Sequence, residues 1–111
     1  MESDTIEKIF NYLKKEFEFD EQDVNEMLDE FLSNTHSLLE RSSESLKNGT
    51  WNELKRTAHS IKGASANLGA DMISLLGKEL ENASFSSDKE KAEAIITEIS
   101  KALENLKNQH S

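Results

Sequence analysis

Apolar residues recur every three or four positions along almost the whole chain, and this spacing constrains the fold more than any other feature of the sequence. Such spacing places the apolar side chains along one face of an α-helix. No segment shows the alternation of β-branched and polar residues that is typical of a strand, and the 111 residues include no proline. The sequence therefore predicts an all-α protein.

The pattern divides into five helical segments. The first spans about residues 4–16 and ends near Glu18-Phe19. A long helix follows at about 21–47, and a third runs from Trp51 to a stop at Gly69. The last two helices hold residues 72–83 and 92–106, and residues from about Asn108 onward are expected to fray.

Polar residues between these segments match helix-capping patterns. Asp20 is predicted to cap the long helix, and Asn48-Gly49 to end it in left-handed geometry. The stretches 50–53 (TWNE) and 87–90 (SDKE) match the capping box, in which the first and fourth residues bond to each other's backbone. Asp71 is predicted to cap the helix that holds residues 72–83.

Four amphipathic helices joined by short loops pack most simply as an antiparallel up-down-up-down four-helix bundle. We expect the bundle at about residues 20–107, the segment 4–16 as an accessory helix, and the chain 1–111 as a single domain. The first helix is expected to bury an apolar stripe of Ile6, Ile9, Phe10, Leu13 and Phe17. Along the long helix the residues expected to face the core are Val24, Leu28, Phe31, Thr35, Leu38 and Ser42.

Charge and cysteine content narrow the classes of function. The chain has 22 acidic and 13 basic residues, a net charge of -9, so it should repel nucleic acid and anionic membranes and bind proteins instead. It has no cysteine, which excludes disulfides and thiolate metal sites. No signal peptide or membrane span can be drawn, so we expect a soluble, cytoplasmic protein.

One stretch, AHSIKGASANLG at positions 58–69, places a base, a cation and a glycine within one helical turn. Because Ala58 belongs to the core stripe, His59 lies about 100° around the helix axis, at the border of that stripe. Lys62 follows one turn later, where its ammonium can reach an anion attached to the imidazole. Gly63 shares this face and costs about 1 kcal/mol relative to alanine in a helix, so we expect a role that needs a missing side chain, such as access for another protein.

This arrangement suits phosphoryl transfer. A neutral imidazole can attack phosphorus and carry the phosphoryl group as a covalent intermediate. Such transfer needs mainly positioning and charge stabilisation, which an accessible nitrogen and a nearby cation supply. The divalent metal that the phosphoryl oxygens need requires clustered carboxylates, which cannot be placed beside His59 from the sequence, so we expect it from a partner.

Other interpretations of the stretch stay open. His59 alone is compatible with a surface histidine that has no task, and Lys62 with a solvated lysine. Gly63 and the following residues 64–66 also fit close packing between two helices. Lys55 and Arg56 form a small basic spot that either attracts a partner's acidic pocket or only keeps the helix soluble.

Further residues near the stretch are candidates for partner docking. Ala66 shares the face of His59, and antiparallel packing puts Leu38 and Leu39 roughly level with it. These leucines form either a docking patch or core contacts, or lie under the N-terminal helix. Neither His36 nor His59 has a glutamate three residues before it, so no helical metal site is predicted, and His110 is assigned to the tail without a role.

The residues 59–65 (HSIKGAS), followed by Leu68-Gly69, resemble the signature of histidine-containing phosphotransfer (HPt) domains, four-helix bundles that accept and donate phosphoryl groups in phosphorelays. The resemblance implies that His59 is the phosphoacceptor and that Lys62 helps to hold the phosphoryl group. It also implies that Gly63 opens the site and Gly69 makes the helix-ending turn. The partners would be response-regulator receiver domains, which bring their own Mg²⁺, and a sensor histidine kinase.

The chain offers no site for ATP. The closest approach to a phosphate loop, residues 69–78, has the wrong glycine spacing, and Glu79 follows where Ser or Thr is needed. We therefore predict a stand-alone, monomeric phosphocarrier that is not itself a kinase and has no intrinsic cofactor. The alternative is a helical adaptor that binds a receiver or kinase without carrying phosphate.

Overall fold

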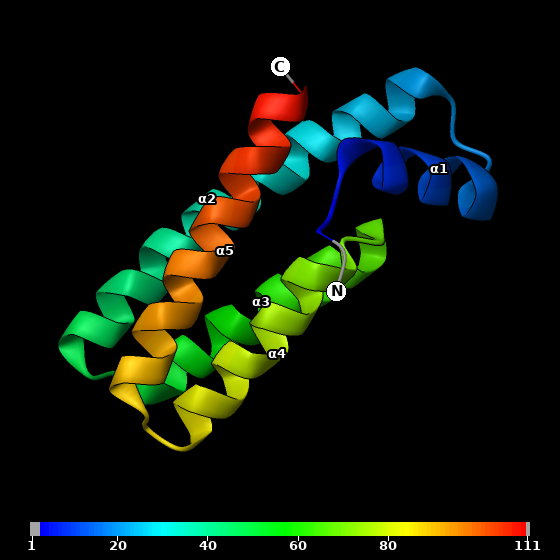
Figure 1. Ribbon diagram of the computed structural model, residues 1–111. Coiled ribbons are helices and arrows are strands. Elements are labelled where there is room, and N and C mark those ends of the chain that lie inside the picture. The colour runs from blue at the N-terminus through cyan, green and yellow to red at the C-terminus, as the bar shows by residue number, and fades with distance from the viewer. Residues whose placement is uncertain (1–2, 111) are drawn as a thin grey trace.

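The computed structural model describes residues 3–110, and within that range every regular element is an α-helix (Figure 1). The elements are α1 (Ile6–Phe17), α2 (Glu21–Asn48), α3 (Trp51–Leu68), α4 (Asp71–Phe85) and α5 (Lys89–His110). The all-α prediction is confirmed, and the bounds of the first four helices agree with the sequence pattern to within two residues. The predicted domain also includes residues 1, 2 and 111, which lie outside the described residues.

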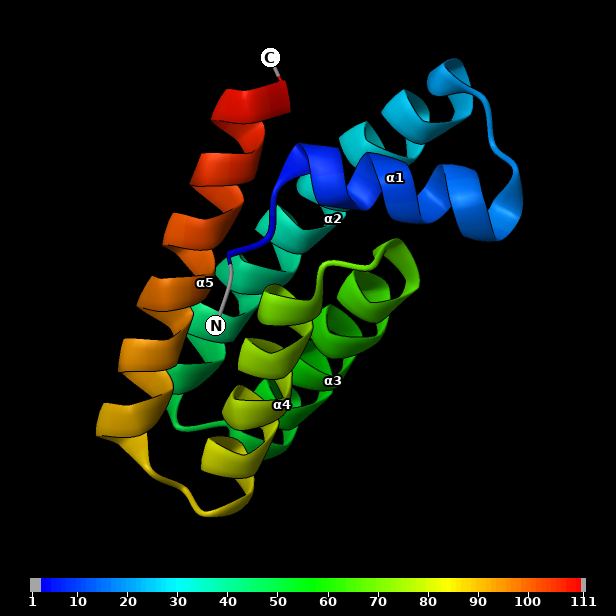
Figure 2. The same ribbon diagram turned by 45° about the vertical axis from the view of Figure 1, so that its right-hand side comes forward.

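The four longer helices run alternately up and down and form the expected antiparallel bundle, while α1 lies across one of its ends (Figures 1 and 2). α3 packs on α4, and α2 and α5 complete the bundle. All five helices contribute to a single core, because each buries one apolar stripe. The largest fully buried side chains include Ile9, Leu13, Leu28, Leu54, Ile61, Ile73, Leu80, Ile99 and Leu106.

Three positions of the predicted stripes are wrong. In α2 the core takes Leu39, which is 6 % exposed, while Leu38 is only partly buried. In α4, Ile73 is fully buried, although the spacing predicts a stripe without it that consists of Met72, Leu75, Leu76, Leu80 and Ala83. Phe17 is 49 % exposed at the end of α1, where its ring stacks on Phe19. A stripe that repeats by three and four drifts around a straight helix, so its buried edge shifts along a helix as long as α2.

The helix ends confirm some predicted caps and correct others. Asp20 caps α2, as expected, and it also forms a capping box with Asp23, which was not predicted. The predicted box at 50–53 does not form, because the Thr50 hydroxyl donates to a carbonyl of α2. At 87–90 the cap is the second residue rather than the first: Asp88 Oδ1 accepts from the backbone N–H of Lys91.

The start of α4 is capped from a distant part of the chain. Asp71 was expected to cap this helix, but it is the first helical residue. The Asp4 carboxylate, just before α1, accepts from the backbone N–H groups of Met72 and Ile73 at 2.9 and 2.8 Å. A carboxylate at this end also complements the helix dipole. Asp4 is thereby fixed to the start of α4.

The C-terminal end of α5 is ordered, contrary to the expected fraying from Asn108. The helix continues to His110, whose Nε2 lies 2.7 Å from Asp29 Oδ1 of α2. The side-chain oxygen of Gln109 accepts the backbone N–H of Ile6, at the start of α1. His110 is therefore a residue that joins α5 to α2.

Candidate functional site

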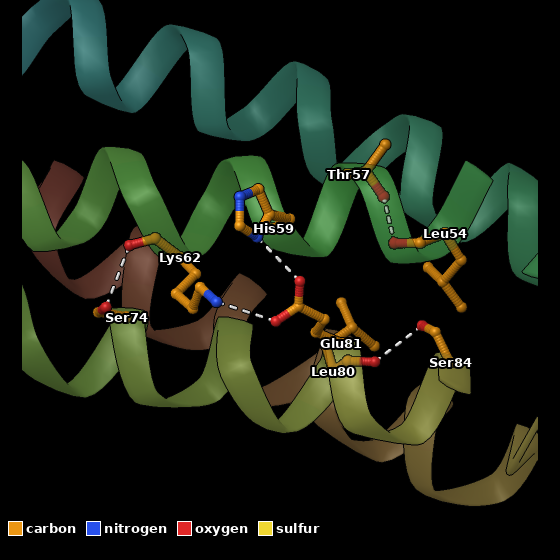
Figure 3. Close-up of polar contacts among 8 residues, drawn as sticks. All are labelled: Leu54, Thr57, His59, Lys62, Ser74, Leu80, Glu81 and Ser84. Carbon is orange, nitrogen blue, oxygen red and sulfur yellow. Dashed lines mark hydrogen bonds and ion pairs between the residues drawn. The ribbon is translucent and has the colours of Figure 1, made fainter. Parts of the chain in front are cut away.

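His59 lies in the middle of α3 with its imidazole facing away from the core. The side chain is 67 % exposed, and its Nδ1 lies 2.9 Å from Oε2 of Glu81 on α4 (Figure 3). An ionised carboxylate can only accept a hydrogen bond, so Nδ1 must carry the ring proton and donate it to Glu81. No described residue bonds to the other ring nitrogen, Nε2, which keeps its lone pair.

The same carboxylate binds Lys62. Its ammonium donates to Oε1 of Glu81 at 2.9 Å, and Figure 3 shows the glutamate between the two side chains of α3. This hydrogen bond, with a smaller contribution from His59, lowers the pKa of Glu81 below its ordinary value and outweighs the partial burial that would raise it. Lys62 is thus a member of an ionic network, and the interpretation as a free solvated lysine is wrong.

Glu81 reaches α3 because the two helices approach closely at Gly77, one turn earlier on α4. A Cβ added to Gly77 would lie 2.9 Å from the backbone nitrogen of Lys62. In the same region the Ser74 hydroxyl donates to the Lys62 carbonyl at 3.0 Å. A missing side chain and a hydrogen bond therefore set the spacing of α3 and α4 at the site.

The two glycines predicted to serve the site have different roles. A Cβ added to Gly63 would meet nothing within 4 Å, so this glycine does not mediate close packing between helices, which was the open alternative. Its position leaves the surface beside His59 free. Gly69 ends α3 at a φ of 76°, the left-handed geometry that was predicted, and a Cβ there would collide with the ring of Tyr12.

A comparison with protein-family models finds a match to the Hpt domain over residues 26–109. This match covers α3 and α4, most of α2 and all but the last residue of α5, and therefore the whole site. The chain belongs to the Hpt domain family. Hpt domains are phosphocarrier modules without a kinase domain of their own, and they interact with receiver domains and kinases in phosphorelays. Neither the curated proteins nor the solved structures include a significant match.

The residues predicted to dock a partner on this Hpt domain differ in their exposure to solvent. Ala66 is exposed on the face of His59. Lys55 and Arg56 are exposed one turn before His59, and the Lys55 ammonium lies 5.6 Å from the centre of the Phe85 ring. Leu39 is buried in the core, so it is not a docking residue, and the alternative of a core contact is correct.

The sequence pattern of this Hpt domain did not predict the positions of Glu81, Gly77 and Phe85. Their positions depend on the register between α3 and α4, which the spacing within either helix does not determine. The one signal was Gly77 itself, a glycine inside a helical pattern, which often marks a close approach.

Within residues 3–110, no helix is long and apolar enough to span a membrane, and no three His, Cys, Asp or Glu side chains gather where they could hold a metal ion.

Proposed function

We propose that this Hpt domain is a phosphocarrier in which His59 accepts a phosphoryl group from the phospho-aspartate of a receiver domain and passes it to another receiver. The observation that carries the proposal is the hydrogen bond of 2.9 Å between His59 Nδ1 and Glu81. It supports the proposal because it fixes the ring tautomer and leaves the lone pair on Nε2 of a side chain that is 67 % exposed.

In the proposed step, the Nε2 lone pair forms a P–N bond while the bond between phosphorus and the aspartyl oxygen breaks. The aspartate leaves as a carboxylate with the electron pair of that bond. The imidazole keeps its proton on Nδ1 and becomes positively charged, and the negative charge of Glu81 beside Nδ1 stabilises it. Transfer to the next receiver is the reverse of this step with a new aspartate.

Lys62 is proposed to hold the phosphoryl group. Its ammonium has three N–H donors, so it can keep the bond to Glu81 and donate to a phosphoryl oxygen as well. The carboxylate of Glu81 is already shared by His59 and Lys62. We therefore assign the Mg²⁺ of the reaction to carboxylates of the receiver, with no cofactor of this chain's own.

The proposal includes the setting of the carrier. We place it in the cytoplasm as a monomer, with a sensor histidine kinase at the head of the relay. The net charge of -9 supports protein partners rather than nucleic acid.

The direct test is transfer from a receiver domain that carries radiolabelled phosphate on its aspartate. The label is expected to appear on the Hpt domain in an acid-labile, alkali-stable form, and His59→Gln should abolish it. His36→Gln is the matched control, because His36 is an exposed histidine on α2 paired with Glu40, and it should be labelled normally. Binding of the receiver without any label would contradict the proposal and support the adaptor.

A further inference from the structure

The most exposed large apolar side chain among the described residues is Phe85, the last residue of α4. It is 81 % exposed, whereas Phe17 and Tyr12 are 49 % and 37 % exposed. The Lys55 ammonium lies 5.6 Å from the centre of its ring, which is within the range of a cation–π contact. An exposed phenylalanine contributes little to the stability of the domain, so its position on the surface needs another explanation.

Phe85 and Lys55 extend the row of contacts that forms the site. Phe85 follows Glu81 by four residues on α4, and Lys55 precedes His59 by four residues on α3. Because α3 and α4 are antiparallel, both steps lead in the same direction along the bundle, by about 6 Å at 1.5 Å per residue. The contact between Lys55 and Phe85 therefore lies one helical turn beyond the contact between His59 and Glu81.

A protein whose interface is centred on His59 also covers the contact between Lys55 and Phe85. A specific interface buries about 800 Å² on each partner, which corresponds to a disc of roughly 16 Å radius. Phe85 lies well inside such a disc centred on His59. Aromatic side chains near the centre of an interface are the residues that most often dominate binding energy. The contact with Lys55 restrains the Phe85 ring before a partner binds, which lowers the entropy cost of binding.

We propose that Phe85, held by Lys55, is an anchor that the receiver domain buries when its aspartate reaches His59. The inference rests on the proposed function, because it assigns a docking residue to the same site. The occupant is a receiver rather than a second copy of this chain, because two copies would each bring a net charge of -9. Lys55 and Arg56, of which Arg56 lies 3.9 Å from Glu53, bring cationic groups to this part of the surface that suit the acidic pocket of a receiver.

The test compares two phosphoryl donors for Phe85→Ala. With purified receiver domains phosphorylated on aspartate, the receiver concentration that gives half-maximal transfer should rise by about tenfold or more. With phosphoramidate, a small donor that needs no docking surface, the rate of His59 labelling should equal that of the wild type. Because the side chain is 81 % exposed, the variant should fold normally.

Phe17→Ala is the matched control, since it removes another exposed phenylalanine, at the end of α1 beyond Tyr12. It should change neither reaction. An unchanged half-maximal concentration for Phe85→Ala overturns the inference and leaves the proposed function intact. Self-association of the wild type in sedimentation that Phe85→Ala abolishes would assign the residue to a dimer instead. A wild type that accepts phosphate from no receiver contradicts the proposed function as well.

Discussion

The backbone of Lys62 passes so close to Gly77 that a Cβ on that glycine would lie 2.9 Å from the Lys62 nitrogen. This approach brings α4 within reach of the polar face of α3. Glu81, one turn after Gly77, then bonds to both His59 and Lys62 at 2.9 Å. The position of the carboxylate at the site is thus a consequence of a glycine that bears no functional group.

Substitutions at Gly63 and Gly77 should have opposite effects on stability. Gly63→Gln fills open space and replaces a poor helix former, so the free energy of unfolding should rise by about 0.5 kcal/mol. Gly77→Ala forces a methyl group against the backbone of α3, and the overpacking should outweigh the gain in helix propensity by about 1 kcal/mol. Urea unfolding at neutral pH measures both changes.

Gly63 should also affect phosphoryl transfer. The long side chain of Gly63→Gln should slow transfer from a receiver although the domain is more stable, because it obstructs the approach to His59. Equal transfer rates for this variant and the wild type would show that Gly63 does not provide access.

Loss of the negative charge at Glu81 should slow the reaction. Glu81→Gln keeps a hydrogen-bonding group beside Nδ1 of His59 but removes the charge that stabilises the phosphorylated ring. We expect transfer to fall by about tenfold, which corresponds to about 1.4 kcal/mol of lost stabilisation. Single-turnover transfer at saturating receiver measures it.

Glu79→Gln is the control for this substitution, because Glu79 is an exposed glutamate on the same helix. It should leave the rate unchanged. If both variants transfer at the wild-type rate, Glu81 is a structural residue only.

The ionic network should also make stability depend on pH. The pKa of Glu81 is lower in the folded domain than its ordinary value of 4.5, so its ionised form stabilises the fold above that value. This stabilisation is lost as the pH falls through the lowered pKa. At about pH 7 the wild type should exceed Glu81→Gln by about 1 kcal/mol in free energy of unfolding, and the difference should shrink as the pH falls below 4.5 through the lowered pKa of Glu81. A difference that is independent of pH would contradict this assignment.

The sequence predicts the features that depend on residues close together in the chain, and it does not predict those that depend on packing between helices. Helix bounds and the exposed face that carries His59, Lys62 and Gly63 follow from periodicity within α3, and the structure confirms them. Glu81 could not be predicted, because its role depends on the register between two helices. The burial of Leu39 in place of Leu38 has a related cause, since the buried edge of α2 drifts along its 28 residues.

The helix caps show the same limit. The Asp20 cap is local in sequence and was predicted, whereas the cap of α4 comes from Asp4, which is 68 residues away from Met72. Asp71 matched the local pattern, but the distant carboxylate has the geometry that bonds to the free N–H groups. A capping pattern contains only neighbouring residues, so it cannot predict a cap from a residue that the fold brings close.

The assignment of the α4 cap to Asp4 rather than Asp71 gives a direct prediction. Asp4→Ala should destabilise the domain by about 1 kcal/mol, because two N–H groups at the start of α4 lose their acceptor. Asp71→Ala should cost clearly less, since Asp71 is exposed and contributes only through the helix dipole. Thermal unfolding of the two variants compares them, and the reverse order would contradict the assignment of the cap.

The most direct test of the account is to locate the phosphoryl group after transfer from a receiver. Nitrogen NMR of the isotope-labelled domain distinguishes the two ring nitrogens of each of its three histidines. The account predicts phosphorylation of His59 at Nε2, with the Nδ1 proton still bonded to Glu81. A phosphoryl group on Nδ1, or on His36 or His110, would contradict it.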